Sequence, residues 1–198
     1  NNASLDPDHP GKILGDPTEG ALIYLADAFG IDQLAHEDAY PRVFEQPFDS
    51  DRKRMSTVHE ENGSFYAYTK GAVDEMLPLC TQVLTAEGPR PMTESDRESI
   101  LQLCYDMSAQ ALRVLGFAMK RMQTVPEDDD ENIEYELTFL GACGMIDPPR
   151  EEAKKAVETC RQAGIQAVMI TGDHKTTAVA IAKSLGILTE GKEALTGQ

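Results

Sequence analysis

The stretch MSTVHEENGSFYAYTKG, residues 55–71, holds the strongest fold signal in the sequence. Two runs rich in β-branched and aromatic residues, 55–61 and 64–71, flank the dipeptide Asn62-Gly63. An Asn-Gly pair tolerates the positive backbone φ angles of a two-residue turn, so it predicts a tight β-hairpin. The sequence therefore predicts an antiparallel sheet in the first part of the chain.

Helix and strand signals continue on both sides of this hairpin. Asp16 is a good helix N-cap and Pro17 suits the first helical position, so a helix is expected from there to Gly30. Glu19 falls where a capping box places its carboxylate. Thr93 is expected to cap a longer, second helix. Further strands are expected at 42–47, 81–85, 112–122 and 136–146, with a short helix at 72–80.

The order of these elements predicts an α+β domain over residues 1–146, an antiparallel sheet with flanking helices on one face. The acidic stretch 126–136, between the last two strands, is expected to be a solvated loop. Pro148-Pro149 makes a stiff joint, because proline restricts both itself and the residue before it. A second domain is therefore expected over residues 147–198.

The second domain has a different pattern. Helices are expected at 150–164 and 174–186, where apolar residues recur at helical spacing. Between them, the apolar run 165–171 is typical of a parallel strand that is buried on both faces. Helix, strand and helix in this order predict part of a doubly wound α/β domain.

Length and charge narrow the possible classes of protein. With 198 residues and 41% hydrophobic side chains, the chain can bury a core. The net charge of −16 argues against a nucleic-acid partner, which would need a basic face. Residues 1–146 contain 27 acidic and 11 basic side chains and residues 147–198 contain seven of each, which supports the boundary between them.

The sequence carries no sign of a membrane span or of export. Its apolar runs fall short of the ~20 residues that cross a bilayer. It has no initiating Met and no signal peptide, so we expect a piece of a larger protein. The four cysteines are far apart and form no CxxC pair, which favours reduced thiols over disulfides or a metal site.

Phosphate-binding loops of the common kinds, GxxxxGK[ST] and GxGxxG, are missing from the sequence. Thr171, Gly172 and Asp173 instead follow the apolar run 165–171, at the end of a parallel strand where open α/β sheets place ligands. A Thr hydroxyl and free backbone N–H groups at a helix start favour a phosphoryl group. Asp173 is equally suited to cap the following helix and do nothing else.

Phe48 stands directly before the densest basic cluster in an acidic chain, residues 52–54. An exposed ring can stack on a base, with Met55 beside it, and Lys53 can meet a phosphate as a point charge. A core Phe at a strand edge, beside a solvated charged turn, is the more common arrangement.

Two further cations lie at strand positions. Lys70 ends an apolar strand, and Gly71 after it lets the backbone approach a neighbour closely. Arg113 is a single charge inside another apolar strand, aimed either at an anion or at solvent. Taken alone, each of these has an ordinary structural explanation.

Taken together and in order, six motifs resemble the successive signatures of the P-type cation-transporting ATPases: GDPTEGAL, FDSDRKRMS, YTKGA, LRVLGFA, GMIDPPR and MITGDH. The resemblance covers the chain from about Gly15 to Ile187, and DPPR followed by TGD at this distance is specific. The first two motifs look most like the type II branch, which includes calcium pumps. The resemblance implies a nucleotide-binding domain over 1–146. It also implies a hinge with a fragment of the haloacid-dehalogenase-like phosphorylation domain over 147–198.

The resemblance also implies an adenine pocket. Phe48 would stack on the base with Met55 beside it, and Glu19 would hydrogen-bond the edge of the adenine. Lys70 would line the floor. The residues that the resemblance assigns to this pocket are Glu19, Phe48, Met55, Lys70, Gly71 and Ala72.

The opposite end of ATP would meet cations and the second domain. The resemblance implies that Lys53 and Arg113 reach the phosphates. It implies that Thr171, Gly172 and Asp173 face the γ-phosphate when the domains close, as the catalytic part of the site. Residues 147–150 would form part of the hinge.

The intact protein would be an integral membrane pump, with this part soluble on its cytoplasmic face. DKTGT, which holds the phosphorylated aspartate, and GDGxND, which helps to hold Mg²⁺, do not occur in the sequence. They would lie outside it, as would the rest of the phosphorylation domain, the actuator domain and the membrane helices. The chain is therefore expected to bind ATP, to hold no metal ligands of its own and not to turn ATP over.

Two departures from the family pattern qualify these expectations. Ser50 stands where many relatives carry Arg, so one phosphate contact is either missing or supplied by Arg52. Val73-Asp74 stands where a Pro-Glu pair is usual, which changes the start of a helix. Two alternatives stay open at this point, a stand-alone phosphatase of the haloacid-dehalogenase type and a non-enzymatic module that docks through its acidic loop.

Overall fold

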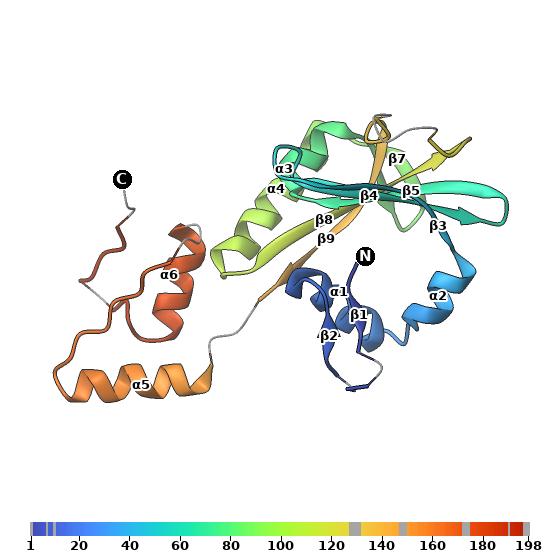
Figure 1. Ribbon diagram of the computed structural model, residues 1–198. Coiled ribbons are helices and arrows are strands. Elements are labelled where there is room, and N and C mark those ends of the chain that lie inside the picture. The colour runs from blue at the N-terminus through green and yellow to red at the C-terminus, as the bar shows by residue number, and fades with distance from the viewer. Residues whose placement is uncertain are drawn as a thin grey trace. The chain divides into compact units, whose positions relative to one another are not determined.

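The computed structural model describes residues 2–6, 8–9, 11–126, 132–146, 150–171, 175–189 and 191–195. Its largest feature is a seven-stranded sheet with the order β3-β4-β5-β8-β9-β6-β7 (Figure 1). The strands are β3 (Arg42–Asp49), β4 (Arg54–Glu61), β5 (Ser64–Gly71), β6 (Cys80–Thr85), β7 (Gly88–Pro91), β8 (Arg113–Met122) and β9 (Leu137–Met145).

The helices and the small sheet complete the list of elements. Strands β1 (Ser4–Leu5) and β2 (Ile13–Leu14) pair in a separate two-stranded sheet. The helices are α1 (Pro17–Ala28), α2 (Gln33–Ala39), α3 (Val73–Met76), α4 (Glu94–Ala109), α5 (Glu151–Gln162) and α6 (Lys175–Ser184), with a 3-10 turn at Leu77–Leu79. The sequence pattern did not predict β1, β2, β7 or α2. None of the helices in the described part of the chain combines the length and apolarity that crossing a membrane requires.

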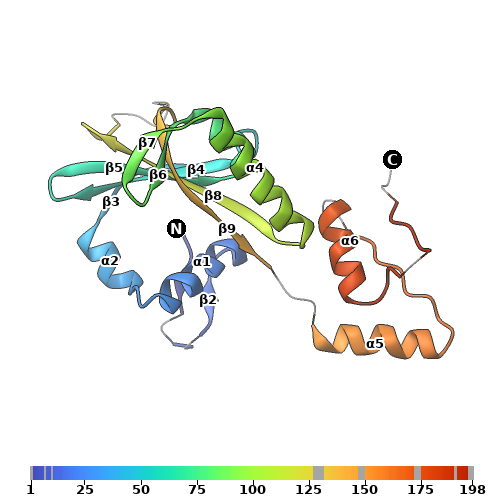
Figure 2. The ribbon, with the colours of Figure 1, turned by 180° about the vertical axis from the view of Figure 1, so that it is seen from behind.

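The sheet is mixed, although the sequence predicted an antiparallel one. Four neighbouring strand pairs are antiparallel, including the hairpin of β6 and β7 at the edge opposite β3 (Figure 2). β6 and β9 pair in parallel, with Cys80 opposite Leu137 and Val83 opposite Phe139. A parallel pair needs a long crossover, and here the chain passes through β7, α4 and β8 between the two strands.

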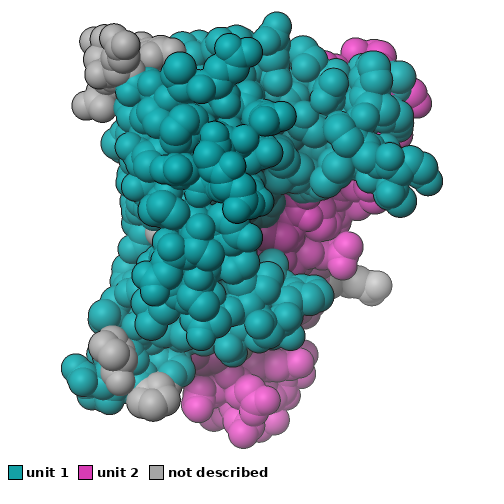
Figure 3. Space-filling view, turned by 90° about the vertical axis from the view of Figure 1, so that its right-hand side faces the viewer, with its two compact units in different colours: residues 1–93, 116–141 teal, residues 94–115, 142–198 magenta. Residues whose placement is uncertain are grey.

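The chain divides into two compact units (Figure 3). One contains Asn1–Thr93 with Gly116–Gly141, and the other contains Glu94–Leu115 with Ala142–Gln198. Helix α4, which follows Thr93 directly as expected, thus falls in the second unit, where it contacts α6. The four cysteines are thiols and form no disulfide with one another.

The predicted hairpin of β4 and β5 is confirmed. Asn62 and Gly63 have φ angles of 50° and 73°, which are the left-handed values that a two-residue turn requires. The register is unbroken from Glu61 opposite Ser64 to Arg54 opposite Gly71. Because side chains alternate along a strand, every second residue of each strand lies on the same face.

The two faces of the hairpin have different surroundings. On one face Val58 and Ala67 are fully buried, and they form the core cluster with Ile133. Phe44, Phe65 and Met122 pack against this cluster. The other face carries the alternate residues, Met55, Thr57, His59, Tyr66, Tyr68 and Lys70, which line the cavity described below.

The solvated loop predicted at 126–136 is correct only in part: the described residues form no helix or strand and Asn132, Tyr135 and Glu136 are exposed, but Ile133 and Glu134 are not solvated. Residues 127–131 lie outside the described residues. Ile133 and Glu134 are both only 1% exposed. Ile133 packs into the core cluster, and two arginines neutralise Glu134, so a carboxylate in an acidic stretch can be buried.

The parallel strand predicted at 165–171 is also wrong. These residues carry no regular secondary structure, and the apolar side chains of Ile165, Val168 and Ile170 are exposed, the last by 93%. A strand is held by a neighbour that completes its hydrogen bonds, and none of the described strands pairs with this segment. The two predicted helices that flank it are present as α5 and α6.

Candidate functional site

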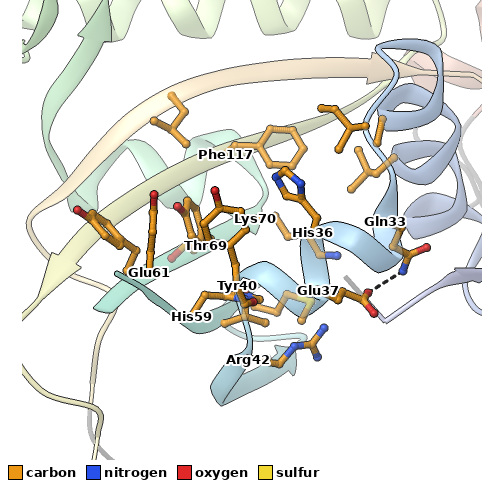
Figure 4. A pocket seen from close by; sticks show the side chains of 18 of the residues that line it. Gln33, His36, Glu37, Tyr40, Arg42, His59, Glu61, Thr69, Lys70 and Phe117 are labelled. Atoms are coloured by element: carbon orange, nitrogen blue, oxygen red, sulfur yellow. Dashed lines mark hydrogen bonds between the residues drawn. The ribbon is translucent and has the colours of Figure 1, made fainter. Parts of the chain in front are cut away.

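A cavity of about 940 Å³ lies between the open face of the β4–β5 hairpin and the helices α1 and α2 (Figure 4). This volume is in the range of small-molecule sites, about 300–1,000 Å³. Every residue that lines it belongs to the first unit. Helices α1 and α2 contribute Leu22, Ile23, Ala26, Gln33, His36 and Glu37.

One residue of the cavity wall forms an ion pair with a second residue that the family resemblance assigned to the same site. Lys70 lies near the end of β5 and lines the cavity, and its Nζ is 2.5 Å from Oε1 of Glu19 in the first turn of α1. Both side chains are only 15% exposed. The second carboxylate oxygen of Glu19 accepts a hydrogen bond from the backbone N–H of Asn2 at 2.9 Å. The fold therefore brings Lys70 and Glu19 to the same side of the sheet.

Apolar side chains stand beside this pair. In the sheet register Met55 lies opposite Lys70, and Lys70 lies opposite Phe117 of β8, so the three share one face. Met55 is almost fully buried and, like Phe117, lines the cavity. Sequence reasoning missed Phe117. The signal was present, because pairing LRVLGFA with YTKGA through their glycines places this ring beside Lys70, but that pairing is not visible from either segment alone.

Phe48 is 64% exposed, which rules out the alternative of a core phenylalanine. It lies near the end of β3, just before the turn that leads into β4, and it is not among the residues that line the cavity. Asp49 shapes this turn, because its Oδ1 accepts hydrogen bonds from the N–H groups of Asp51 and Arg52 at 3.0 and 2.9 Å. The Arg52 N–H is the main reason why the pKa of Asp49 is lowered.

Two of the three cations in the basic cluster are bound to a buried carboxylate. Arg52 Nη1 lies 2.7 Å from both carboxylate oxygens of Glu134, and Arg54 Nε lies 2.5 Å from its Oε2. The hydroxyl of Ser56 donates to Glu134 Oε1 at 2.9 Å and lies 2.8 Å from the hydroxyl of Thr69. Sequence reasoning missed Glu134, because one acid in an acidic stretch gives no distinguishing signal.

These contacts bear on the suggestion that Arg52 replaces the arginine usual at the position of Ser50. Besides its bonds to Glu134, Arg52 donates through Nη2 to the carbonyl oxygen of Pro47 at 2.7 Å. The guanidinium of Arg52 therefore links the turn to the buried Glu134. The structure gives no support for a contact between Arg52 and a phosphate.

Lys53 is the third cation of the cluster, and its side chain is about half exposed. Its Nζ lies 2.9 Å from Oε1 of Glu75 in α3, and this contact raises the pKa of Lys53 and lowers that of Glu75. The Lys53 carbonyl accepts a hydrogen bond from the N–H of Ala72 at 3.0 Å. An added Cβ at Gly71 would lie 2.6 Å from that carbonyl oxygen, so glycine is needed there for the close approach of the two chain segments.

Arg113 and Thr171, two further site residues predicted from the sequence, do not line this cavity. Arg113 is exposed at the start of β8, in the second unit. Thr171 is exposed in the segment without regular structure, also in the second unit. Gly172 and Asp173, like residues 147–149 of the predicted hinge, lie outside the described residues. Their predicted roles stay predictions.

A metal site does not emerge from the described part of the chain. No group of three or more His, Cys, Asp or Glu side chains in that part is placed to hold an ion. We therefore assign no residue to Mg²⁺.

Comparison with known proteins points to one family. Residues 1–152 match a family model described as the cytoplasmic domain N of P-type ATPases. The chain is 48% identical over 183 residues to calcium-transporting ATPase 1 of Bacillus cereus, covering 92% of this chain and 20% of that protein. It is 40% identical over 188 residues to calcium-transporting ATPase 1 of Lactococcus lactis, with 95% and 21% covered. It is 45% identical over 180 residues to the cation-transporting ATPase pma1 of Synechocystis, with 90% and 20% covered. The chain thus spans about a fifth of the length of these relatives.

Proposed function

The chain belongs to the P-type cation-transporting ATPases, and we propose that it is the part of such a pump that binds ATP. The observation that carries the proposal is that Lys70, which lines a cavity large enough for a nucleoside, is paired with Glu19. Met55 and Phe117 add an apolar surface next to that pair, on which a purine can pack.

The residues that the family resemblance assigns to the site suit the parts of ATP in a definite way. The exposed ring of Phe48 offers a face on which adenine can stack. The Glu19 carboxylate can accept a hydrogen bond from the adenine amino group, and Lys70 can donate to a ring nitrogen. Gly71 and Ala72 shape the backbone beside the base, and Lys53 lies at the same turn as Phe48 with its ammonium at the surface.

The phosphate end of ATP would extend toward residues of the second unit. In this proposal Arg113 supplies positive charge to the phosphates. Thr171, Gly172 and Asp173 meet the γ-phosphate when the nucleotide-binding domain closes on the phosphorylation domain, with residues 147–150 as the hinge. ATP supplies the phosphoryl group that an aspartate outside this sequence accepts.

Within the whole pump, this chain's contribution is to hold and orient ATP. Positioning and charge neutralisation supply most of the catalysis in phosphoryl transfer of this kind. Because the DKTGT and GDGxND motifs are absent from the sequence, the chain on its own binds ATP without hydrolysing it. In the intact protein Mg²⁺, the actuator domain and membrane helices complete a pump that moves calcium or a similar cation.

Isothermal titration of ATP into the purified chain tests the proposal. We expect saturable binding that Phe48→Ala weakens by about fivefold or more, because stacking a base on an aromatic ring contributes about 1–3 kcal/mol. Phe29→Ala is the matched control, because Phe29 is another exposed ring of the first unit but lies at the C-cap of α1, not beside the turn that carries Lys53. Equal weakening by both variants, or no binding at millimolar ATP, would count against the proposal.

A further inference from the structure

Glu75 of helix α3 forms an ion pair with Lys53, the cation that is expected to contact the phosphates. Glu75 Oε1 lies 2.9 Å from Lys53 Nζ, and the two side chains are 41% and 52% exposed. Both residues therefore remain accessible to a ligand in solvent. The pattern that predicted a phosphate contact for Lys53 contains no hint of this acid, which follows the YTKGA motif by three residues.

The backbone on both sides of the pair is fixed, so the contact is a built feature of the fold. Lys53 has a φ of 50°, and its N–H donates to the carbonyl oxygen of Asp49 at 2.7 Å. Its own carbonyl accepts from the N–H of Ala72, which is the N-cap residue of α3. The start of α3 is thereby tied to the turn, and Glu75 lies within one turn of that tie.

A phosphate chain and the Glu75 carboxylate need the same ammonium group. The lysine ammonium is a single compact charge. An anion already in contact with it therefore reduces the favourable binding energy that a second anion can gain from it. Asp74 adds a further negative charge that acts on Lys53. The neighbouring Arg52 and Arg54 are bound to Glu134 and do not relieve this competition.

We propose that Glu75 sets the affinity of the site for the phosphate chain, by competing with it for Lys53. The proposal rests on the function proposed above and deepens it. ATP must displace the Glu75 carboxylate, whereas adenosine, which lacks phosphates, binds without disturbing the Lys53–Glu75 pair. Glu75 thus reduces the ratio of the affinity of the site for ATP to its affinity for adenosine.

Titration of ATP and adenosine into the wild-type chain and the Glu75→Gln variant tests this directly. The variant should bind ATP about two- to fivefold more tightly, in line with the strength of exposed ion pairs, and adenosine with unchanged affinity. The gain should shrink as salt is raised, because salt screens exposed charges. Glu158→Gln is the matched control, since Glu158 is an exposed acid whose Oε2 lies 2.6 Å from Arg161 in the second unit.

A double-mutant cycle separates competition from a general effect of charge. In a Lys53→Met background, Glu75→Gln should no longer tighten ATP binding. An equal gain in both backgrounds, an equal gain for adenosine, or no gain at all would overturn the proposal. If ATP binds and Phe48→Ala weakens it while Glu75→Gln has no effect, only this inference fails. If no variant binds ATP, the proposed function fails with it.

Discussion

At the scale of single residues, the buried carboxylate of Glu134 holds the turn that carries Phe48 and Lys53. It binds Arg52 and Arg54 at the two ends of the basic cluster, and it reaches Thr69 of β5 through Ser56. Buried charge is tolerated only when it is paired and hydrogen-bonded, and here every partner lies on the turn or on the strands that follow it. Glu134 therefore helps to position the turn between β3 and β4, which contains Lys53 and closely follows Phe48.

Glu134→Gln should lower the free energy of unfolding by about 3 kcal/mol, because it removes the buried counter-charge of Arg52 and Arg54 and leaves Arg52 only its 4.0 Å contact with Asp49. The loss belongs near the lower end of the range for buried pairs, since Arg52 keeps 29% of its side chain exposed. Urea denaturation measures it, and Glu136→Gln, at an exposed position two residues further on, is the control. Equal stability of the two variants would show that the network contributes nothing to the fold.

His59 makes stability depend on pH. Partial burial is the main cause that lowers the pKa of His59 below its ordinary value near 6.5, and the nearby Arg42 adds to it. Its Nδ1 lies 2.8 Å from the carbonyl oxygen of Tyr40 and its Nε2 lies 3.0 Å from the hydroxyl of Thr57, an arrangement that suits a neutral ring. Below pH 6.5 the unfolded chain takes up a proton that folded His59 resists, so stability is full above that pH and falls beneath it.

Denaturation at pH 7.5 and pH 5.5 tests this linkage. We expect the wild-type chain to be less stable at pH 5.5, and His59→Gln to reduce the difference between the two values. Glu45 and Glu158, whose pKa values are lowered from 4.5, contribute in a more acidic window and do not obscure the result. An unchanged difference in His59→Gln would show that another group is responsible.

At the scale of elements, the β4–β5 hairpin depends on its two turn residues. The left-handed φ of Gly63 costs a residue with a Cβ about 1–2 kcal/mol, and an added Cβ there would meet no other atom within 4 Å. Gly63→Ala should therefore destabilise the chain by that amount through backbone conformation alone. Asn62→Gly should be neutral or slightly stabilising, because glycine adopts the φ of 50° freely. Thermal unfolding of both variants checks the pair, and equal losses would contradict this explanation.

The sequence predicted best those elements whose signals are local. The hairpin turn, the Asp16 cap of α1 and the end of β5 at Gly71 depend on residues next to one another, and they lie where the pattern placed them. Asp16 indeed accepts hydrogen bonds from the N–H groups of Thr18 and Glu19.

The contacts that the sequence could not predict join distant segments. The parallel pairing of β6 with β9 and the bonds from Glu134 to Arg52 depend on which segments meet in space. For the candidate site, composition alone favoured a buried Phe48. The family resemblance instead implied that its ring stacks on the base. The ring is in fact exposed, so it is available for stacking. The apolar run 165–171 was predicted to be buried and is largely exposed. Hydrophobicity predicts burial only where a partner strand exists.

At the scale of the whole molecule, the chain consists of two compact units, and the cavity belongs to the first. That unit supplies the features that the proposed function needs from this chain to bind the base: a cavity of about 940 Å³, a lysine in its wall that is paired with Glu19, and the exposed ring of Phe48. The second unit carries Arg113 and Thr171, whose proposed roles in contacting the phosphates stay predictions.

A titration of the ¹⁵N-labelled chain with ATP, followed by two-dimensional NMR, tests the central claim most directly. The account predicts saturable shifts of the amide signals of Phe48, Met55, Lys70 and Phe117, with the signals of α5 unchanged. Signals that stay in place up to millimolar ATP, or that move only outside the cavity and the Phe48 turn, would contradict it.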